Sequence, residues 1–422
     1  MKKITFILAL ILVCSHILLA QNPNENKKPR IALILSGGGA KGIAHIPVLQ
    51  MLDSLGIVPD LVVGNSMGSI VGGLYAMGYS GDSIAHIAKT ANWDNLIGGN
   101  VSLNNVSVEE KTEFGRYLVG MGAKDGKIKL TPFLLNDQNL RTFLADLTYP
   151  VYTNTNFDKL SIPFRAIATD IVNGKEVVLD KGGLAFAMRA SMSIPGAFIP
   201  VPYENTLLID GGVLNNFPVD VTKKLNVDYI IGSDVGGGME PKEKLDNITT
   251  LLFQTGMLHS NLKNPENRAL CDILIDHTSY LSFSTGDFSK SEEIYEEGKI
   301  ATNLNLNALI NLSKKIKEFK QLEHKLPIVN EEIILDTIVY NNISKYNLAL
   351  VKARTNIKTN KSYTKQDILK GINRTMGTTI FSHITFTSLT TKNKRGLQLN
   401  VFEKQKSYMG LVLYPCRRCA YP

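Results

Sequence analysis

Residues 31–55 read IALILSGGGAKGIAHIPVLQMLDSL, and this stretch decides the fold class of the chain. The apolar run Ile31–Leu35 predicts a buried strand, the glycine run that follows predicts a turn, and Ile43–Leu55 predicts a helix. Further apolar runs of strand length follow at Leu61–Val63, Phe164–Thr169, Leu207–Ile209, Tyr229–Ile231 and Ile273–Ile275. Further helices are predicted at Ser66–Met77, Ser83–Thr90, Leu184–Met192 and Ala301–Phe319. Apolar strands that alternate with helices indicate an α/β fold with a mainly parallel central sheet.

The glycine run Gly37-Gly38-Gly39-Ala40-Lys41-Gly42 lies directly between the first strand and the first helix. Backbone amides in such a turn point at a negatively charged group. The same G-x-G-x-x-G spacing occurs in dinucleotide-binding folds, in which an acidic residue closes the second strand and holds a ribose. Here the second strand ends in Gly64-Asn65-Ser66, so the residue that would favour a dinucleotide is absent.

A second motif, Gly64-Asn65-Ser66-Met67-Gly68, has the form G-x-S-x-G and follows the strand Leu61–Val63. Glycines on both sides of a serine permit the sharp strand-to-helix turn that leaves the hydroxyl exposed near a helix N-terminus. The strand, turn and helix context predicts that Ser66 is a nucleophile.

The third motif is Asp210-Gly211-Gly212, which follows the strand Leu207–Ile209. Asp-Gly is a common turn pair, and a tight turn is the simpler explanation of this motif alone. However, all three motifs follow predicted strands of one parallel sheet, and such sheets bind ligands at the carboxyl ends of their strands. Together the motifs predict one site at one edge of the sheet.

No histidine of the chain has the context of a catalytic base. An α/β-hydrolase needs an acid and then a histidine after its serine, and several strands before it. Only one strand plainly precedes the strand of Ser66, and the downstream candidates lie in no recognisable motif: His86, His259, His277, His324 and His383. His45 is predicted to be a packed or hydrogen-bonded helix residue. Two catalytic residues are therefore favoured over three.

The three motifs, in this order, resemble the patatin-like phospholipases. Two further stretches, Ile162–Asp170 and Ala190–Phe198, look like signatures of the same family. Lys41 stands where the family often has arginine, and Gly212 where plant members have alanine. The resemblance implies a three-layer patatin-like fold and a serine lipid acyl hydrolase that acts as a phospholipase A, lysophospholipase or carboxylesterase.

The resemblance also implies a role for each motif residue. Ser66 and Asp210 would form a catalytic dyad that works through an acyl-enzyme. The implied oxyanion hole comprises Gly37, Gly38, Gly39 and Gly42, with the amides of Gly38 and Gly39 as donors. The nucleophile elbow is completed by Gly64, Asn65, Met67 and Gly68. The acid motif is completed by Gly211 and Gly212. A carboxylate with an ordinary pKa of about 3.9 is a weak base for serine, so Asp210 is predicted to be recessed. No metal or cofactor is expected.

The N-terminus has the features of an export signal. Lys2 and Lys3 precede an apolar run, and Ala20 offers a small residue for cleavage, so residues 1–20 are predicted to be a signal peptide and 21–29 a polar linker. An uncleaved membrane anchor is the alternative. The hydrolase domain is assigned to residues 30–325. The expected location is periplasmic or outer-membrane-associated, and the cell surface is a further candidate.

A second unit follows over residues 331–403. It is predicted to comprise a strand at Ile333–Tyr340, a helix opened by a Thr364–Asp367 capping box, and strands at Ile384–Phe386 and Leu397–Val401. This small α+β module resembles a POTRA domain, which in bacterial patatin relatives joins the hydrolase to an outer-membrane barrel. Residues 404–422 are interpreted as a remnant or irregular tail, without that barrel.

Charge and composition indicate the partners. Hydrophobic residues make up 44% of the chain and charged residues 20%, as in ordinary globular proteins. Residues 331–422 hold 15 Lys/Arg and 5 Asp/Glu, an excess of +10 that leaves −2 for residues 1–330 of the total +8. In an exported protein such a basic region favours an anionic membrane surface over nucleic acid. The expected partners are a phospholipid or lysophospholipid substrate, a membrane surface and an outer-membrane barrel. As an alternative to the enzyme, the chain could be a non-catalytic assembly or binding module.

Overall fold

The computed structural model describes residues 28–98, 119–124, 127–130, 135–246, 248–329, 332–378, 380–391, 394–404 and 408–411. The predicted signal peptide, Cys416 and Cys419 lie outside these ranges. Within them, no helix is both long enough and apolar enough to cross a membrane.

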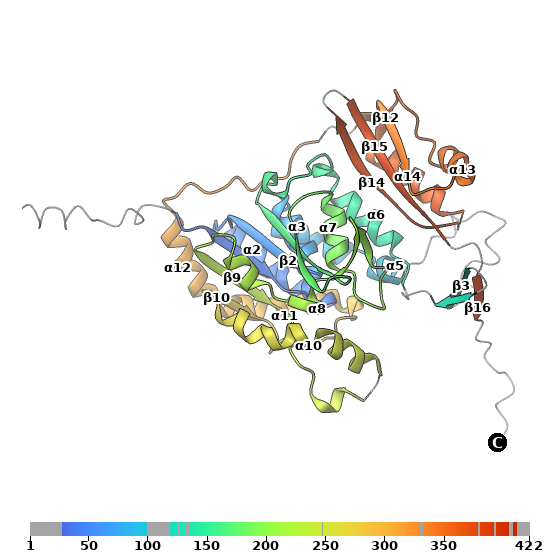
Figure 1. The fold of residues 1–422 in the computed structure, drawn as a ribbon. Helices are drawn as coiled ribbons and strands as arrows, with labels where there is room; N and C mark the ends of the chain where they lie inside the picture. The colour runs from blue at the N-terminus through green and yellow to red at the C-terminus, as the bar shows by residue number, and fades with distance from the viewer. Residues whose placement is uncertain are drawn as a thin grey trace, which may run out of the picture.

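An eight-stranded mixed sheet forms the centre of the larger, N-terminal domain (Figure 1). Five neighbouring strands run parallel, in the order β10 (Ile273–Asp276), β9 (Tyr229–Asp234), β1 (Ile31–Leu35), β2 (Leu61–Asn65) and β5 (Phe164–Asp170). The antiparallel strands β8 (Thr206–Asp210) and β7 (Val201–Tyr203) follow on the β5 side, and β6 (Lys175–Leu179) also pairs with β5. The α/β class with a mainly parallel sheet is confirmed.

The direction of β8 differs from the prediction, which placed Asp210 on a parallel strand. β8 runs antiparallel to β5, and Ala168 pairs with Asp210, the last residue of β8. β8 overlaps β5 only at the end of β5 that carries Ala168 to Asp170. Asp210 therefore reaches the same edge of the sheet as the end of β2, because the short overlap places the end of β8 there.

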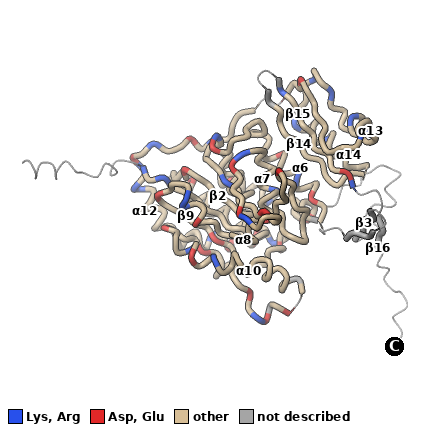
Figure 2. The backbone as a smooth tube through the Cα atoms, in the orientation of Figure 1, with Lys and Arg blue, Asp and Glu red and all other residues tan. Residues whose placement is uncertain are grey.

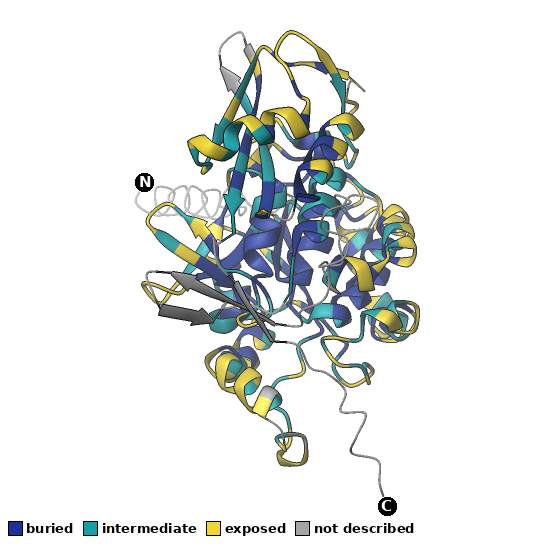
Figure 3. Ribbon diagram, turned by 90° about the vertical axis from the view of Figure 1, so that its right-hand side faces the viewer, coloured by how far each residue is buried: buried dark blue, intermediate teal, exposed yellow. Residues whose placement is uncertain are grey.

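Both faces of the sheet are buried, as its continuous apolar strands require (Figure 3). On β1, Ile31, Leu33 and Leu35 belong to the larger apolar cluster, whereas Ala32 and Ile34 belong to a second cluster. The helices that contribute to the larger cluster include α2 (Ile46–Ser54), α3 (Met67–Ala76), α4 (Gly81–Thr90), α7 (Leu184–Ser191), α11 (Ser291–Leu304) and α12 (Leu306–Ile316). The second cluster includes residues of α9 (Val219–Lys223). The domain thus has three layers.

Some helices differ from their predicted bounds. The glycine run continues into a 3-10 helix, Gly39–His45, before α2 begins at Ile46 with Pro47 in its first turn. The helix predicted at Ala301–Phe319 is instead two helices, α11 and α12, which meet at Asn305. Several helices were not predicted: α5 (Trp93–Gly98), α6 (Gln138–Leu147), the four-residue α8 (Gly212–Asn215) and the 22-residue α10 (Ile248–Ala269).

The small domain places two helices, a three-stranded mixed sheet and a two-stranded antiparallel sheet around its own apolar core. Along the chain it comprises β11 (Glu332–Ile334), β12 (Thr337–Asn341), α13 (Lys345–Thr355), β13 (Ser362–Thr364), α14 (Lys365–Met376), β14 (Phe381–Thr391) and β15 (Lys394–Glu403). The single strand predicted at Ile333–Tyr340 is thus two strands. The capping box of Thr364 and Asp367 is confirmed. Figure 2 shows Lys and Arg around α13 and β15, and the last turn of α13 contains Lys352 and Arg354.

The two domains contact each other through α6 and β14. The side-chain amide of Gln138 donates to the Ile384 carbonyl at 3.2 Å and accepts from the Ile384 amide at 2.8 Å, so it pairs with the strand as a neighbouring backbone would. Lys365 and Asp146 form an ion pair of 2.6 Å across the same interface. In the predicted irregular tail, Tyr408–Leu411 is instead a strand, β16, which pairs with β3 (Val119–Lys124), itself paired with β4 (Lys127–Leu130).

Candidate active site

Ser66 lies at the turn between β2 and α3, where the sequence predicted a nucleophile elbow. It is the N-cap residue of α3 with φ 50° and ψ −124°, a conformation that costs a non-glycine residue of the order of 1–3 kcal/mol. The side chain is 5% exposed. Gly64 is the fourth residue of β2, and Met67 and Gly68 open α3. A Cβ atom on Gly68 would collide with the Leu35 carbonyl, so only glycine lets the helix approach β1 this closely.

A buried serine that was not predicted as part of the site holds this turn. The Ser66 amide donates to Ser191 Oγ at 2.9 Å, and Ser191 Oγ donates to the Ile167 carbonyl at 2.5 Å. Ser191 is fully buried at the end of α7. Ser191, on a third element, thus holds the main chain of Ser66 in place.

Asp210 ends β8 and is recessed, with 6% of its surface exposed. Its Oδ1 accepts the Gly212 amide at 2.8 Å, and its own amide donates to the Ser193 carbonyl at 3.0 Å. Burial raises the pKa of Asp210 to about 6, although the Ser66 hydroxyl, the Gly212 amide, Asn65 and Arg189 all favour the charged form. The predicted recess is confirmed, and the carboxylate has the proton affinity of a base that works near neutral pH.

The glycine run has two open amide donors, which are the two that the sequence predicted as donors. The Gly37 amide donates to the Asn216 carbonyl at 3.1 Å. Gly42 lies within the 3-10 helix and packs against the Met67 side chain. Within the described residues, the amides of Gly38 and Gly39 have no hydrogen-bond acceptor. Gly39 has φ +56° and lies against the Thr285 carbonyl, a position that suits only glycine.

Asn216 joins the three motifs. Its Oδ1 accepts from Asn65 Nδ2 at 3.0 Å, and its Nδ2 donates to the Gly37 carbonyl at 2.9 Å. Gly211 is required beside Asn65, because a Cβ atom there would collide with the amide oxygen of Asn65. Asn216 was not predicted as a site residue. Its place shortly after Asp210-Gly211-Gly212 was the available signal, but asparagine there is equally typical of a turn.

His45 is buried and hydrogen-bonded, as predicted for a helix residue without a catalytic role. Its Nδ1 lies 2.7 Å from Ser233 Oγ and its Nε2 lies 2.9 Å from the Ser36 carbonyl. Burial lowers the pKa of His45 to about 4. In the part of the chain that the structure describes, no histidine is hydrogen-bonded to Ser66 or Asp210.

A buried arginine supports the site from behind. Arg189 Nη1 donates to Ser193 Oγ at 2.6 Å, and its Nε donates to Asp137 Oδ2 at 2.6 Å. The Ser193 carbonyl in turn accepts the Asp210 amide. Arg189 thus acts on Asp210 through both the Ser193 backbone and its positive charge. Among the described residues, no group of His, Cys, Asp and Glu is arranged to hold a metal ion.

The sequence profile of the patatin-like phospholipases matches residues 33–223. These residues form a patatin-like phospholipase domain. This segment contains the glycine run, the serine elbow and the acid motif, which the geometry above brings to one edge of the sheet.

Relatives of the domain are found in bacteria and fungi. An uncharacterised NTE family protein of Mycobacterium tuberculosis is 32% identical over 212 residues, which are 50% of this chain and 51% of that protein. Lysophospholipase NTE1 of Meyerozyma guilliermondii is 28% identical over 294 residues, 64% of this chain and 19% of that protein. The chain thus spans about half the length of the mycobacterial relative and less of the fungal one.

Two solved structures are similar at a lower level. VipD from Legionella pneumophila has 14% identity and a TM-score of 0.36, with 67% of each chain covered. Human GIVD cytosolic phospholipase A2 has 11% identity and a TM-score of 0.37, with 68% of this chain and 60% of that chain covered.

Proposed function

We propose that this chain is a serine lipid acyl hydrolase that cleaves fatty acyl esters of phospholipids or lysophospholipids through a dyad of Ser66 and Asp210. The observation that carries the proposal is the buried Asp210, whose pKa is raised to about 6 and which interacts with the Ser66 hydroxyl. A turn residue, the simpler explanation of the Asp-Gly pair, has no need of such burial. The lysophospholipase among the relatives supports the substrate class.

The proposed reaction has two halves. Asp210 accepts the proton of Ser66 Oγ, which attacks the ester carbonyl to form a tetrahedral intermediate. The intermediate collapses, the alcohol leaves with the proton from Asp210, and an acyl-enzyme remains on Ser66. Water then loses a proton to Asp210 and attacks the acyl carbonyl. As the bond to Ser66 Oγ breaks, Asp210 returns the proton to Oγ, and the fatty acid is released.

The negative oxygen of the intermediate would be stabilised by the amides of Gly38 and Gly39. Neither amide has another acceptor among the described residues, so both are available without rearrangement. The amino end of α3, which begins directly after Ser66, adds a positive partial charge. Loss of one such donor in other serine hydrolases costs about 2.7–4 kcal/mol.

A fluorophosphonate probe tests the nucleophile. The wild-type protein is expected to be labelled on Ser66, and Ser66→Ala is expected to be silent in both labelling and lipid-release assays. Ser69→Ala is a matched control, because Ser69 is a buried serine one turn further along α3 whose hydroxyl donates to the Ser66 carbonyl. A folded wild-type protein that neither reacts with the probe nor releases fatty acid would instead support the non-catalytic binding module.

A membrane surface is the proposed source of substrate, and α10 supports this. The inner side of α10 covers the acid motif: the Met257 methyl lies against Gly212, and Ser260 Oγ accepts the Asn216 amide at 2.6 Å. Large apolar side chains on the helix are exposed to solvent, at Ile248, Leu251, Leu252, Phe253, Leu258 and Leu262. Exposed apolar patches of this kind mark interaction surfaces, here directly beside the candidate active site.

The double variant Leu252→Ser/Leu262→Ser tests this surface. Hydrolysis of phospholipid vesicles is expected to fall, while hydrolysis of a water-soluble short-chain ester is expected to stay at the wild-type rate. An equal loss on both substrates would show that the leucines support the site itself rather than contact with lipid.

The same proposal includes export to the periplasm or outer membrane by the signal peptide. It also includes a role for the small domain as a POTRA-like module that contacts an outer-membrane barrel partner. Support comes from the order of its elements, β12, α13, α14, β14 and β15, and from its positively charged composition. Fractionation of cells that produce the full chain tests the location. Recovery of the protein only from the cytoplasm would contradict it.

A further inference from the structure

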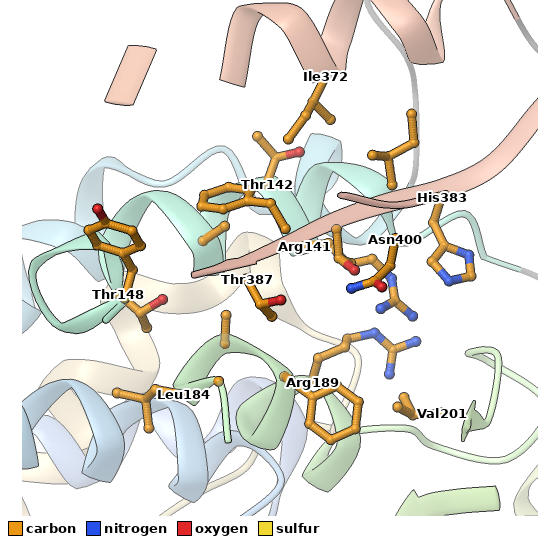
Figure 4. Close-up of a pocket in the computed structure, with 18 of the residues that line it drawn as sticks. Arg141, Thr142, Thr148, Leu184, Arg189, Val201, Ile372, His383, Thr387 and Asn400 are labelled. Atoms are coloured by element: carbon orange, nitrogen blue, oxygen red, sulfur yellow. The ribbon is translucent and has the colours of Figure 1, made fainter. Parts of the chain in front are cut away.

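A cavity of about 350 Å³ lies between the hydrolase domain and the small domain (Figure 4). Residues of α6 and α7 line one side, and residues of α14, β14 and β15 line the other. Ser66 and Asp210 are not among its lining residues, although Arg189, which interacts with Asp210, lines the cavity.

The lining has a polar end and an apolar remainder. Arg141, Arg189, His383 and Asn400 gather at one end of the cavity, and Leu184 lies away from them (Figure 4). Most other lining residues are apolar, and include Phe186, Leu369, Ile372 and Phe386. Two arginines line the cavity, and no Asp or Glu is among the residues that line it.

The two arginines share one carboxylate that lies behind them. Arg141 Nε and Arg189 Nε both donate to Asp137 Oδ2, at 2.9 and 2.6 Å. Burial alone would raise the pKa of Asp137, but Arg141 and Arg189 hold it well below its usual range. Nη1 of Arg141 has no acceptor among the described residues, so this donor is available to a ligand.

His383 adds a polar contact without a charge. It is 6% exposed and stacks on Phe402 with ring centres 4.2 Å apart. Burial and the neighbouring Arg141 lower the pKa of His383 to about 3, with a smaller contribution from Arg189 and an opposing one from Asp137. Arg189 interacts with both Asp137 and Asp210, so these two carboxylates balance the two guanidinium charges at neutral pH. An anion at this end would instead be held by the open Nη1 donor of Arg141, because hydrogen bonds between charged groups are stronger than those between neutral ones.

We propose that this cavity binds an aliphatic monocarboxylate, with the carboxylate at Arg141 and the hydrocarbon chain among the apolar residues. A carboxylate is the anionic group that a guanidinium recognises, and Arg141 Nη1 is the donor that is left open toward it. The volume is at the lower end of the range for small-molecule pockets, which favours a chain of medium length. The proposal concerns binding alone and does not depend on hydrolase activity.

Such a ligand would contact both domains at once. Thr142 on α6 and Thr387 on β14 both line the cavity, next to the pair of hydrogen bonds between Gln138 and Ile384. A molecule that binds only the folded, docked arrangement raises the stability of that arrangement in proportion to the logarithm of its concentration. Binding is therefore visible both as heat and as a higher melting temperature.

Calorimetric titration of the full chain with decanoate tests the proposal. Ser66→Ala protein is used, so that no turnover accompanies binding. One decanoate per chain is expected, with decanol and acetate each bound at least about tenfold more weakly, because decanol lacks the charge and acetate lacks the chain. Equal affinity for decanol and decanoate, or no binding of decanoate, would overturn the proposal.

Three variants place the site. Arg141→Met is expected to weaken decanoate binding by about tenfold or more, in line with the loss of one charged hydrogen bond. Thr387→Trp fills the cavity from a half-buried position and is expected to abolish both binding and the rise in melting temperature. Lys365→Met is the matched control, because it removes a positive charge from the same domain interface without lining the cavity, and should bind decanoate as the parent does. Decanoate affinity that is unchanged in Arg141→Met and Thr387→Trp would locate binding elsewhere and refute the assignment.

Discussion

Replacement of Asp210 by asparagine is expected to stabilise the protein while it removes activity. Burial raises the pKa of Asp210 from 3.8 to about 6, so the folded protein binds this proton more tightly than the unfolded chain does. Below pH 3.8 the neutral carboxyl therefore does not lower the free energy of unfolding. Its ionisation lowers that free energy progressively as the pH rises to about 6. At about 1.4 kcal/mol per pKa unit, the full cost is about 3 kcal/mol. Asparagine carries no charge and keeps an oxygen for the Gly212 amide.

Urea unfolding of the wild type and Asp210→Asn at several pH values measures this cost. The variant is expected to be more stable by about 3 kcal/mol above pH 7 and by well under 1 kcal/mol near pH 4. Its esterase rate is expected to be at background throughout. Ser66→Ala is the control, since it also removes activity but leaves the buried carboxylate, and should show no such growth of stability with pH. A stability difference that is constant with pH, or full esterase activity in Asp210→Asn, would refute the role assigned to this carboxylate.

Three further outcomes are expected from the same geometry. The wild-type rate on a soluble ester should rise with pH and level off above about 6, because Asp210 accepts a proton only when ionised; a flat profile between pH 5 and about 8 would contradict this. Ser191→Ala should lower kcat by about ten- to a hundredfold with little change in KM, as measured by initial rates, because the Ser66 main chain loses its partner; an unchanged kcat would show that the elbow holds its own geometry. Esterase activity should be the same with and without excess chelator, and a loss that added Ca²⁺ restores would reveal a metal requirement.

The central strands and the three motifs could be predicted from the sequence, but the direction of β8 could not. β7 and β8 form a hairpin whose two-residue loop is Glu204-Asn205, and Glu204 has φ 50°. Such loops are usually recognised by glycine or asparagine at the positive-φ position, and a glutamate there gives no signal. Without the hairpin, Leu207–Ile209 looks like one more buried parallel strand.

The helix α10 was missed for a different reason. Prediction of a helix relies on apolar residues that gather on one side, facing a core. In α10 the residues Leu251, Leu252 and Leu262 are exposed, while Ser260 and Asn264 face inward and bond to Asn216 and Asp234. The apolar periodicity by which a helix is recognised is therefore partly reversed in α10.

Residues that hold the site in place carry the least sequence signal, although they decide its geometry. Ser191 and Asn216 each bond to the backbone of another motif, at separations of 125 and 179 residues, and Arg189 bonds to the Ser193 hydroxyl. These residues stabilise two unfavourable features of the site, the positive φ of Ser66 and the buried charge of Asp210. Neither feature would persist without partners that are fixed in advance, since each costs stability on its own. The same argument explains why Arg189, which supports Asp210, is buried beside Asp137: a buried arginine persists only where carboxylates compensate its charge, and Asp137 and Asp210 both do so.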